Sequence, residues 1–226
     1  LPGWHDVPVT QLAAEIYERP AILENDASAA ALAEYRYGAG AGTRNMVYLT
    51  LSTGVGGGVV VGGSLYRGAS GNGGELGHVT IDWHGRACKG CGRRGCLEAY
   101  VSGTSIAERA REAGLDLSTA EDVSAAARAG EPGAQRVWDE TVEALACGLT
   151  SIVNLFEPEL VVLGGGVSLS GDQLIEPVRA AVRASTMQPA GEAADIVQSA
   201  LGERVGVVGA AAIVYDRTVS GGSAHG

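Results

Sequence analysis

The segment from Gly74 to Gly103 restricts the fold more than any other, because it gathers metal-binding side chains into one short stretch. Four such residues lie within nineteen positions: His78, Cys88, Cys91 and Cys96. Structural zinc sites take four nitrogen or sulfur ligands, and two thiolates on a glycine-containing turn reach one ion without strain. The spacing therefore predicts a closed, structural zinc site. His84 is an alternative fourth ligand, and three unpaired surface thiols beside a histidine are the non-metal interpretation.

The remaining cysteine and the nearby cations refine this prediction. Three of the four cysteines fall within nine positions, which fits metal ligation better than a disulfide framework. Four cations would favour the thiolate forms that bind metal: Arg86, Lys89, Arg93 and Arg94. Cys147 lies instead in an apolar helical pattern, which predicts an inert thiol in the core.

Length and charge limit the class of protein. The 226 residues, 46% of them hydrophobic, suffice for one large domain or a domain and a half. A formal net charge of -10 disfavours a nucleic-acid partner, whose phosphates attract basic surfaces. We find no run of eighteen apolar residues and no signal-peptide pattern, so the sequence predicts no membrane association and a cytoplasmic location. The chain begins at Leu1 without an initiator Met, and we expect it to be part of a longer polypeptide.

Hydrophobic periodicity predicts strands that alternate with helices. Apolar and β-branched runs predict strands at residues 21–23, 46–51, 58–62, 160–163 and 195–198. Helical periodicity and capping patterns predict helices at residues 27–37, 104–113, 118–130, 132–157, 173–184 and 208–217, with Thr104 and Ser118 as caps. This alternation favours an α/β sheet with both faces covered.

A glycine-rich stretch lies between two of the predicted strands. It reads Leu51-Ser52-Thr53-Gly54-Val55-Gly56-Gly57-Gly58, and its backbone N–H groups could converge on phosphate oxygens. It lacks the third glycine of the dinucleotide fingerprint and the lysine of a Walker loop. A hairpin turn that binds no ligand is the alternative.

Asp26 lies where a predicted strand meets a predicted helix. The positive end of the helix dipole would hold its carboxyl group ionised, as phosphoryl transfer requires of a base that orients a hydroxyl. An ordinary helix cap is the alternative.

Taken together, these pieces resemble the ROK family of repressors, open reading frames and sugar kinases, over residues 1–215. The resemblance is carried by Glu24-Asn25-Asp26-Ala27, the glycine-rich stretch, Gly74-Glu75-Leu76-Gly77-His78, Cys91-Gly92-Arg93-Arg94-Gly95-Cys96-Leu97-Glu98 and Leu163-Gly164-Gly165-Gly166. It implies an α/β, actin-like or hexokinase-like ATPase fold, mainly its large domain with a structural zinc loop. Residues 1–25 would be a remnant of the small domain and the crossover, residues 26–217 the large domain, and residues 218–226 a disordered tail.

The resemblance also implies roles for single residues. Asp26 would be the base that takes the proton from the attacking sugar hydroxyl. Other sugar hydroxyls would bind Asn25, Glu75, Glu98 and His78, whose second ring nitrogen stays free while the first binds Zn²⁺. ATP with Mg²⁺ would lie against Thr53, Gly54, Gly56, Gly57, Gly164, Gly165 and Gly166. A homodimer is expected on the same ground.

Two features depart from the family pattern. The zinc turn has one extra residue, Cys88-x-x-Cys91, a spacing that still suits zinc. The Asp-x-Gly-x-Thr phosphate motif of the family's kinases is absent, so roughly the first third of a family member is expected to be missing. Three functions remain open: an ATP-dependent kinase acting on the 6-hydroxyl of a glucose-type hexose, a sugar-sensing transcriptional repressor, and a truncated remnant that only binds sugar or partners.

Overall fold

The computed structural model describes residues 7–220, and their side chains as far as Asp216. Five strands form one mixed sheet in the order β3-β2-β1-β4-β5. They are β1 (Met46–Leu51), β2 (Val55–Val61), β3 (Ser64–Leu65), β4 (Leu160–Gly164) and β5 (Asp195–Gln198). β2 runs antiparallel to both β1 and β3, whereas β4 is parallel to β1 and β5 is parallel to β4. Four of the predicted strands are therefore confirmed, although β2 starts earlier than expected.

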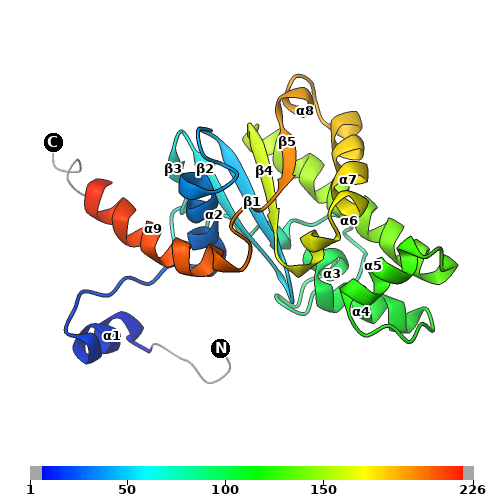
Figure 1. The fold of residues 1–226 in the computed structure, drawn as a ribbon, viewed down its shortest axis with the longest axis horizontal. Helices are drawn as coiled ribbons and strands as arrows, with labels where there is room; N and C mark the ends of the chain where they lie inside the picture. Colours follow the sequence, from blue (N-terminus) through cyan, green and yellow to red (C-terminus); the bar gives the residue numbers. More distant parts are fainter. Residues whose placement is uncertain (1–6, 221–226) are drawn as a thin grey trace.

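Helices cover both faces of the sheet (Figure 1). On one face lie α2 (Asp26–Tyr37) and α9 (Val205–Ser220), which pack against Met46 and Tyr48 of β1. On the other face lie α6 (Pro132–Phe156) and α7 (Asp172–Ser185), which share a core with Val47, Leu49 and Leu51. Alternate side chains of β1 thus enter two different cores, as the two-residue period of a strand requires. The α/β architecture with covered faces is confirmed.

Four more helices extend the second face. They are α3 (Glu98–Val101), α4 (Gly103–Glu112), α5 (Ala120–Arg128) and α8 (Ala190–Ala193), with 3₁₀ turns at Leu76–His78, Gly166–Ser170 and Gly202–Arg204. Two predicted caps are wrong by one or two residues. Ser102, not Thr104, accepts the cap hydrogen bond of α4, and Thr119, not Ser118, forms a capping box with Asp122 on α5.

Two further predictions about buried segments are wrong. Residues 21–23 are not a strand, and Leu23 is 65% exposed, because no strand of the sheet lies beside them. Cys147 is exposed and not in the core. It lies on the side of α6 opposite to the buried stripe that contains Leu145, Leu149 and Ile152.

The two ends of the described chain lie on the same side of the molecule (Figure 1). There α1 (Val9–Tyr17), which the sequence did not predict, stands apart from the sheet and has no buried residue. At the other end α9 continues through residues 218–220, which were predicted to be disordered, and residues 221–226 lie outside the described part. Among residues 7–220, no helix has the length and apolarity needed to cross a membrane.

A buried carboxylate fixes α2 to the chain that follows β5. Glu34 is fully buried, and its oxygens accept hydrogen bonds from the backbone N–H groups of Ala39 (2.8 Å) and Leu201 (2.9 Å). The Ser199 hydroxyl (2.5 Å) and the Ala200 N–H (3.3 Å) complete its partners. A buried charge is tolerated when hydrogen bonds replace its hydration, and this carboxylate has four.

Candidate functional site

The turn before α2 presents two polar side chains to solvent. Asn25 is the cap of α2, since its Oδ1 accepts a hydrogen bond from the Ser28 N–H at 3.0 Å. Asp26 is the first helical residue, and its Oδ1 accepts the Ala27 N–H at 2.8 Å. Both residues are exposed. The alternative interpretation of Asp26 as the helix cap is therefore wrong, because Asn25 occupies that position and the second Asp26 oxygen faces no described donor.

The glycines of β2 allow α2 and a second segment to approach the strand from opposite sides. A Cβ atom on Gly56 would lie 2.8 Å from the Ala27 Cβ, and one on Gly58 would lie 2.5 Å from the Ala31 Cβ. On the opposite face, a Cβ atom on Gly57 would lie 2.7 Å from the Gly74 carbonyl oxygen. The start of α2 and the segment leading to Glu75 thus meet at the beginning of β2.

This packing changes the interpretation of the glycine-rich stretch. The turn itself is short, because the Ser52 N–H already donates to the Gly54 carbonyl oxygen at 2.9 Å. Gly56 and Gly57 are strand residues, paired with Thr50 and Leu49 of β1. Close packing accounts for these two glycines, and their predicted contact with phosphate remains a prediction.

The four predicted metal ligands converge on one point. Their ligand atoms all lie within 4.8 Å of one another, with Cys91 Sγ 3.5 Å from Cys96 Sγ and Cys88 Sγ 3.7 Å from His78 Nδ1. A tetrahedral zinc ion with Zn–S bonds of about 2.3 Å needs ligand separations of about 3.8 Å. The residues therefore fit Zn²⁺, with Nδ1 of His78 as the ligand atom. His84 is not part of the cluster, so that alternative is wrong.

The surroundings of the three thiols differ. Hydrogen bonds from the backbone and side chain of Arg93 lower the pKa of Cys91 to about 6. Burial raises the pKa of Cys96 to about 12 and also raises the pKa of Cys88. Of the four cations expected to favour thiolates, Arg93 does so. Arg86 and Lys89 form ion pairs with Glu112 and Glu108 instead.

Glu98 joins the metal cluster to the beginning of β2. Its Oε2 accepts the Val55 N–H at 2.9 Å, and its Oε1 accepts a hydrogen bond from the Cys88 thiol at 3.4 Å. A Cβ atom on Gly90 would lie 2.3 Å from this Oε1 and 3.2 Å from His78 Cε1, so the carboxylate and the imidazole border the same glycine. Two predicted sugar ligands, Glu98 and His78, are thus neighbours.

Glu75 precedes this cluster and is exposed at the start of the Leu76–His78 turn. The loop leading to it is anchored to the Asp26 turn by an ion pair, in which Arg67 Nε donates to Glu24 Oε2 at 2.9 Å. Sequence reasoning missed this pair. The segments that carry the predicted sugar-binding and catalytic residues all contact the first half of β2, through Ala27, Gly74 and Glu98. The predicted residues on these segments are Asn25, Asp26, Glu75, His78 and Glu98.

A cavity of about 650 Å³ opens beside the turn between β1 and β2, at Ser52 and Thr53. Thr53 and Gly166 line it, whereas the other predicted nucleotide-binding glycines do not. Gly164 lies in β4. Gly165 has a φ of 81° and passes so close to Leu51 that a Cβ atom would lie 2.4 Å from the Leu51 carbonyl oxygen. Packing thus explains the glycine at position 165.

Much of the remaining wall of this cavity comes from α4 and α5, which were not connected with a ligand from the sequence, and Val167, Leu169 and Ser170 also line it. Thr104 Oγ1 donates to the Thr53 carbonyl oxygen at 2.9 Å, so the N-terminus of α4 lies beside the turn after β1. From α5 and its cap come Thr119, Glu121 and Arg128. A volume of this size is typical of small-molecule sites, and a helix N-terminus favours anions such as phosphate.

Comparison with known proteins gives a consistent result. The model of the ROK family matches residues 2–217. A glucokinase of Thermotoga maritima is 40% identical over 230 residues, covering 96% of this chain and 72% of the relative. A xylose repressor of Bacillus subtilis is 33% identical, and the match covers 95% of this chain and 55% of the repressor.

Solved structures agree in fold. The ROK hexokinase of Thermus thermophilus matches with a TM-score of 0.85 at 39% identity, over 96% of this chain and 72% of that one. A ROK glucokinase of Streptomyces griseus, solved with glucose and AMPPNP, matches with a TM-score of 0.82 at 33% identity, over 93% and 73% of the two chains. These matches confirm the actin-like or hexokinase-like fold. The chain belongs to the ROK family.

Proposed function

We propose that this chain carries the sugar-binding and nucleotide-binding part of an ATP-dependent hexose kinase of glucokinase type. The observation that carries the proposal is the exposed Asp26 carboxylate, whose second oxygen has no donor among the residues that the structure describes and which lies at the turn where α2, β2 and the Gly74–His78 segment meet. Two glucokinases match this chain at 40% and 38% identity, and one matching structure contains glucose and a nucleotide analogue. Both facts support a kinase.

In the proposed reaction, Asp26 accepts the proton of the hexose 6-hydroxyl as its oxygen attacks the γ-phosphorus of ATP, and ADP leaves. Asn25, Glu75, Glu98 and the Nε2 atom of His78 hold the other hydroxyls. Because Nδ1 of His78 faces the Cys88 sulfur, a bound Zn²⁺ would fix the ring and aim Nε2 before sugar arrives.

The nucleotide would occupy the 650 Å³ cavity, with its phosphates near Thr53 and the N-terminus of α4. Of the glycines predicted to bind ATP, Gly166 lines this cavity and would lie against the adenosine. The proposed phosphate contacts of Gly54, Gly56 and Gly57 and the proposed adenosine contacts of Gly164 and Gly165 would form beyond the wall of this cavity. Mg²⁺ would neutralise developing phosphate charge when it is bound with ATP. The zinc ion stays structural, because the protein supplies all four ligands.

The proposal extends to the setting of the protein. Residues 1–25 would belong to the small domain and crossover, and residues 26–217 to the large domain. We propose a homodimer in the cytoplasm without a nucleic-acid partner on these residues; the net charge of -10 supports the last point.

The test is the Asp26→Asn variant in a coupled glucose phosphorylation assay. Loss of a general base lowers kcat by about 100- to 10,000-fold. Glucose binding, measured by calorimetry, is expected to persist because Asn25 still caps the helix. Asp116→Asn is the matched control, since Asp116 is exposed and lines neither the turn nor the cavity. Turnover of Asp26→Asn at the wild-type rate would contradict the role of Asp26.

Two other outcomes separate the alternatives. Sugar binding by the wild-type protein without ATP consumption would favour a sugar-sensing repressor, the function named for the Bacillus subtilis relative. Failure to bind either glucose or ATP would favour a catalytically inactive remnant.

A further inference from the structure

A second cavity, of about 940 Å³, lies between the metal-binding loop and α4. The loop side contributes His84, Arg86, Lys89 and Arg94, and α4 contributes Glu108, Arg111 and Glu112. Cys88, Cys91 and Cys96, the zinc-binding thiols, are not in its wall. It is therefore a separate space from the sugar site proposed above, and none of the residues assigned to sugar or ATP lines it.

Two ion pairs join the walls of this cavity. Arg86 donates both terminal nitrogens to the Glu112 carboxylate, at 2.7 and 2.8 Å, and Lys89 pairs with Glu108. A bidentate pair of this kind has a defined geometry, because two parallel hydrogen bonds fix the plane of the guanidinium group. The hydrogen bond from the Arg86 N–H to the Tyr100 hydroxyl, at 3.0 Å, adds a further constraint on the loop. The cavity is thus shaped before any ligand enters.

The charges that line the cavity do not balance. Four cations face two carboxylates, and the two carboxylates are already paired. Arg94 and Arg111 are left without an ion pair to any residue among those the structure describes. This surplus of two positive charges occurs in a chain whose net charge is -10 and which has a single lysine, Lys89. This concave surface is therefore basic, although the chain as a whole is acidic.

We propose that this cavity is a second ligand site, which binds a small phosphate monoester through Arg94 and Arg111. The planar guanidinium group suits phosphate, because its N–H groups match two oxygens of the anion at once. The volume exceeds that of the phosphate group alone, so an attached sugar or nucleoside has room. A sugar phosphate and a nucleoside monophosphate share this chemistry, and the experiment separates them.

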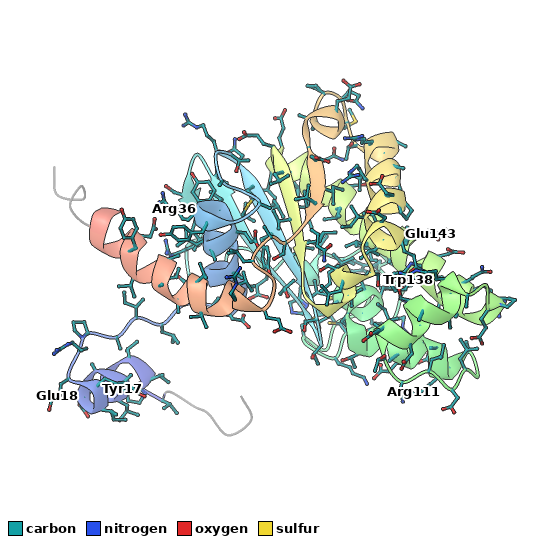
Figure 2. All side chains as sticks on the ribbon, viewed as in Figure 1. Tyr17, Glu18, Arg36, Arg111, Trp138 and Glu143 are labelled. Carbon is teal, nitrogen blue, oxygen red and sulfur yellow. The ribbon has the colours of Figure 1, made fainter. Side chains whose placement is uncertain are left out.

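The site shares a wall with the nucleotide cavity. Arg111 lines both spaces, and Figure 2 shows it at the outer edge of α4. A ligand in the second cavity that binds Arg111 would therefore change the position of a side chain that also lines the nucleotide cavity. Arg94 lines only the second cavity, which makes it the residue of choice for a test.

The test is calorimetric titration of zinc-loaded protein, saturated with AMPPNP, with inorganic phosphate, then with glucose 6-phosphate and with AMP. We expect saturable binding of phosphate and tighter binding of one of the two esters, which identifies the source. Replacement of one charged hydrogen-bonding partner weakens such a contact by roughly tenfold or more, so Arg94→Gln should lose binding by that factor. Arg136→Gln, on the exposed side of α6 and outside both cavities, is the matched control.

Two results would overturn the proposal. One is that none of the three probes binds saturably at concentrations at which glucose binds. The other is equal affinity of Arg94→Gln and wild-type protein, with zinc content and melting temperature unchanged. If Arg94→Gln loses zinc, Arg111→Gln measured with AMPPNP bound replaces it. Because no assay of turnover is involved, a failed kinase assay leaves this test unaffected.

Discussion

Substitution of Glu34 by alanine should destabilise the protein by removing the acceptor that joins α2 to residues 199–201. The change removes the acceptor of two short backbone hydrogen bonds, which the N–H groups of Ala39 and Leu201 donate to the fully buried Glu34 side chain. Each orphaned buried donor costs about 1–3 kcal/mol, while the Ser199 hydroxyl can rotate to another acceptor. Removal of a buried charge returns part of this cost. We expect a net loss of about 3 kcal/mol, which is a large share of the ~5–15 kcal/mol stability of a typical domain.

The assay is thermal unfolding followed by circular dichroism. For a chain of 150–250 residues, a loss of about 3 kcal/mol lowers Tm by roughly 6–12 °C. Glu34→Gln should lie between wild type and Glu34→Ala, because it keeps the volume and one acceptor oxygen. Glu143→Ala on the solvent side of α6 is the control and should leave Tm within about 2 °C of wild type. A shift as small as the control's in Glu34→Ala would refute the reasoning, since it would mean that the four hydrogen bonds contribute nothing net.

Two further predictions concern β2 and β1. Gly58→Ala places a methyl group 2.5 Å from the Ala31 Cβ, and overpacking of this kind costs about 1–3 kcal/mol, so the midpoint of urea unfolding should shift to a lower concentration. Gly62→Ala is the comparison, because its new Cβ atom meets nothing within 4 Å while φ is 58°, so it tests backbone strain without overpacking. Tyr48 is predicted to make the free energy of unfolding depend on alkaline pH. Burial raises the pKa of its hydroxyl to about 12, whereas a tyrosine in the unfolded chain ionises near pH 10. Its contribution to stability is therefore complete below pH 10 and is lost between about pH 10 and 12. Tyr48→Phe should therefore flatten the decline of unfolding free energy over that range, and parallel curves for the two proteins would exclude this cause.

The sequence predicted the metal cluster and most of the sheet because both depend on local patterns. Cys88, Cys91 and Cys96 lie close together in the chain, so a tight turn brings them together. The apolar runs of β1 and β4 are long enough to identify each strand without knowledge of its neighbours.

The errors have a common physical cause, which is dependence on distant parts of the chain. Residues 21–23 have the composition of a strand but no strand to pair with. The close packing of Gly56 against α2 and of Gly57 against the Gly74 segment was not predicted either, because it joins parts of the chain that lie apart in the sequence. The role of Glu34 was missed because three of its four hydrogen-bond donors lie 165–167 residues away in the sequence. The Glu24–Arg67 ion pair was missed because its two residues lie 43 positions apart. No local pattern marks such residues.

The close contact between α2 and β2 has a consequence for the accuracy with which Asp26 is placed. Gly56 faces Ala27 and Gly58 faces Ala31, so at these two positions helix and strand meet through backbone atoms and methyl groups. Methyl groups have no rotamers, and the distance between the two elements cannot drift as it would if long side chains could rearrange. The backbone of Asp26, one residue before Ala27, is therefore held by a contact that has no side-chain torsions to change. Thermal motion at this carboxylate should be dominated by its own two side-chain torsions, while the helix beneath it behaves as a fixed support.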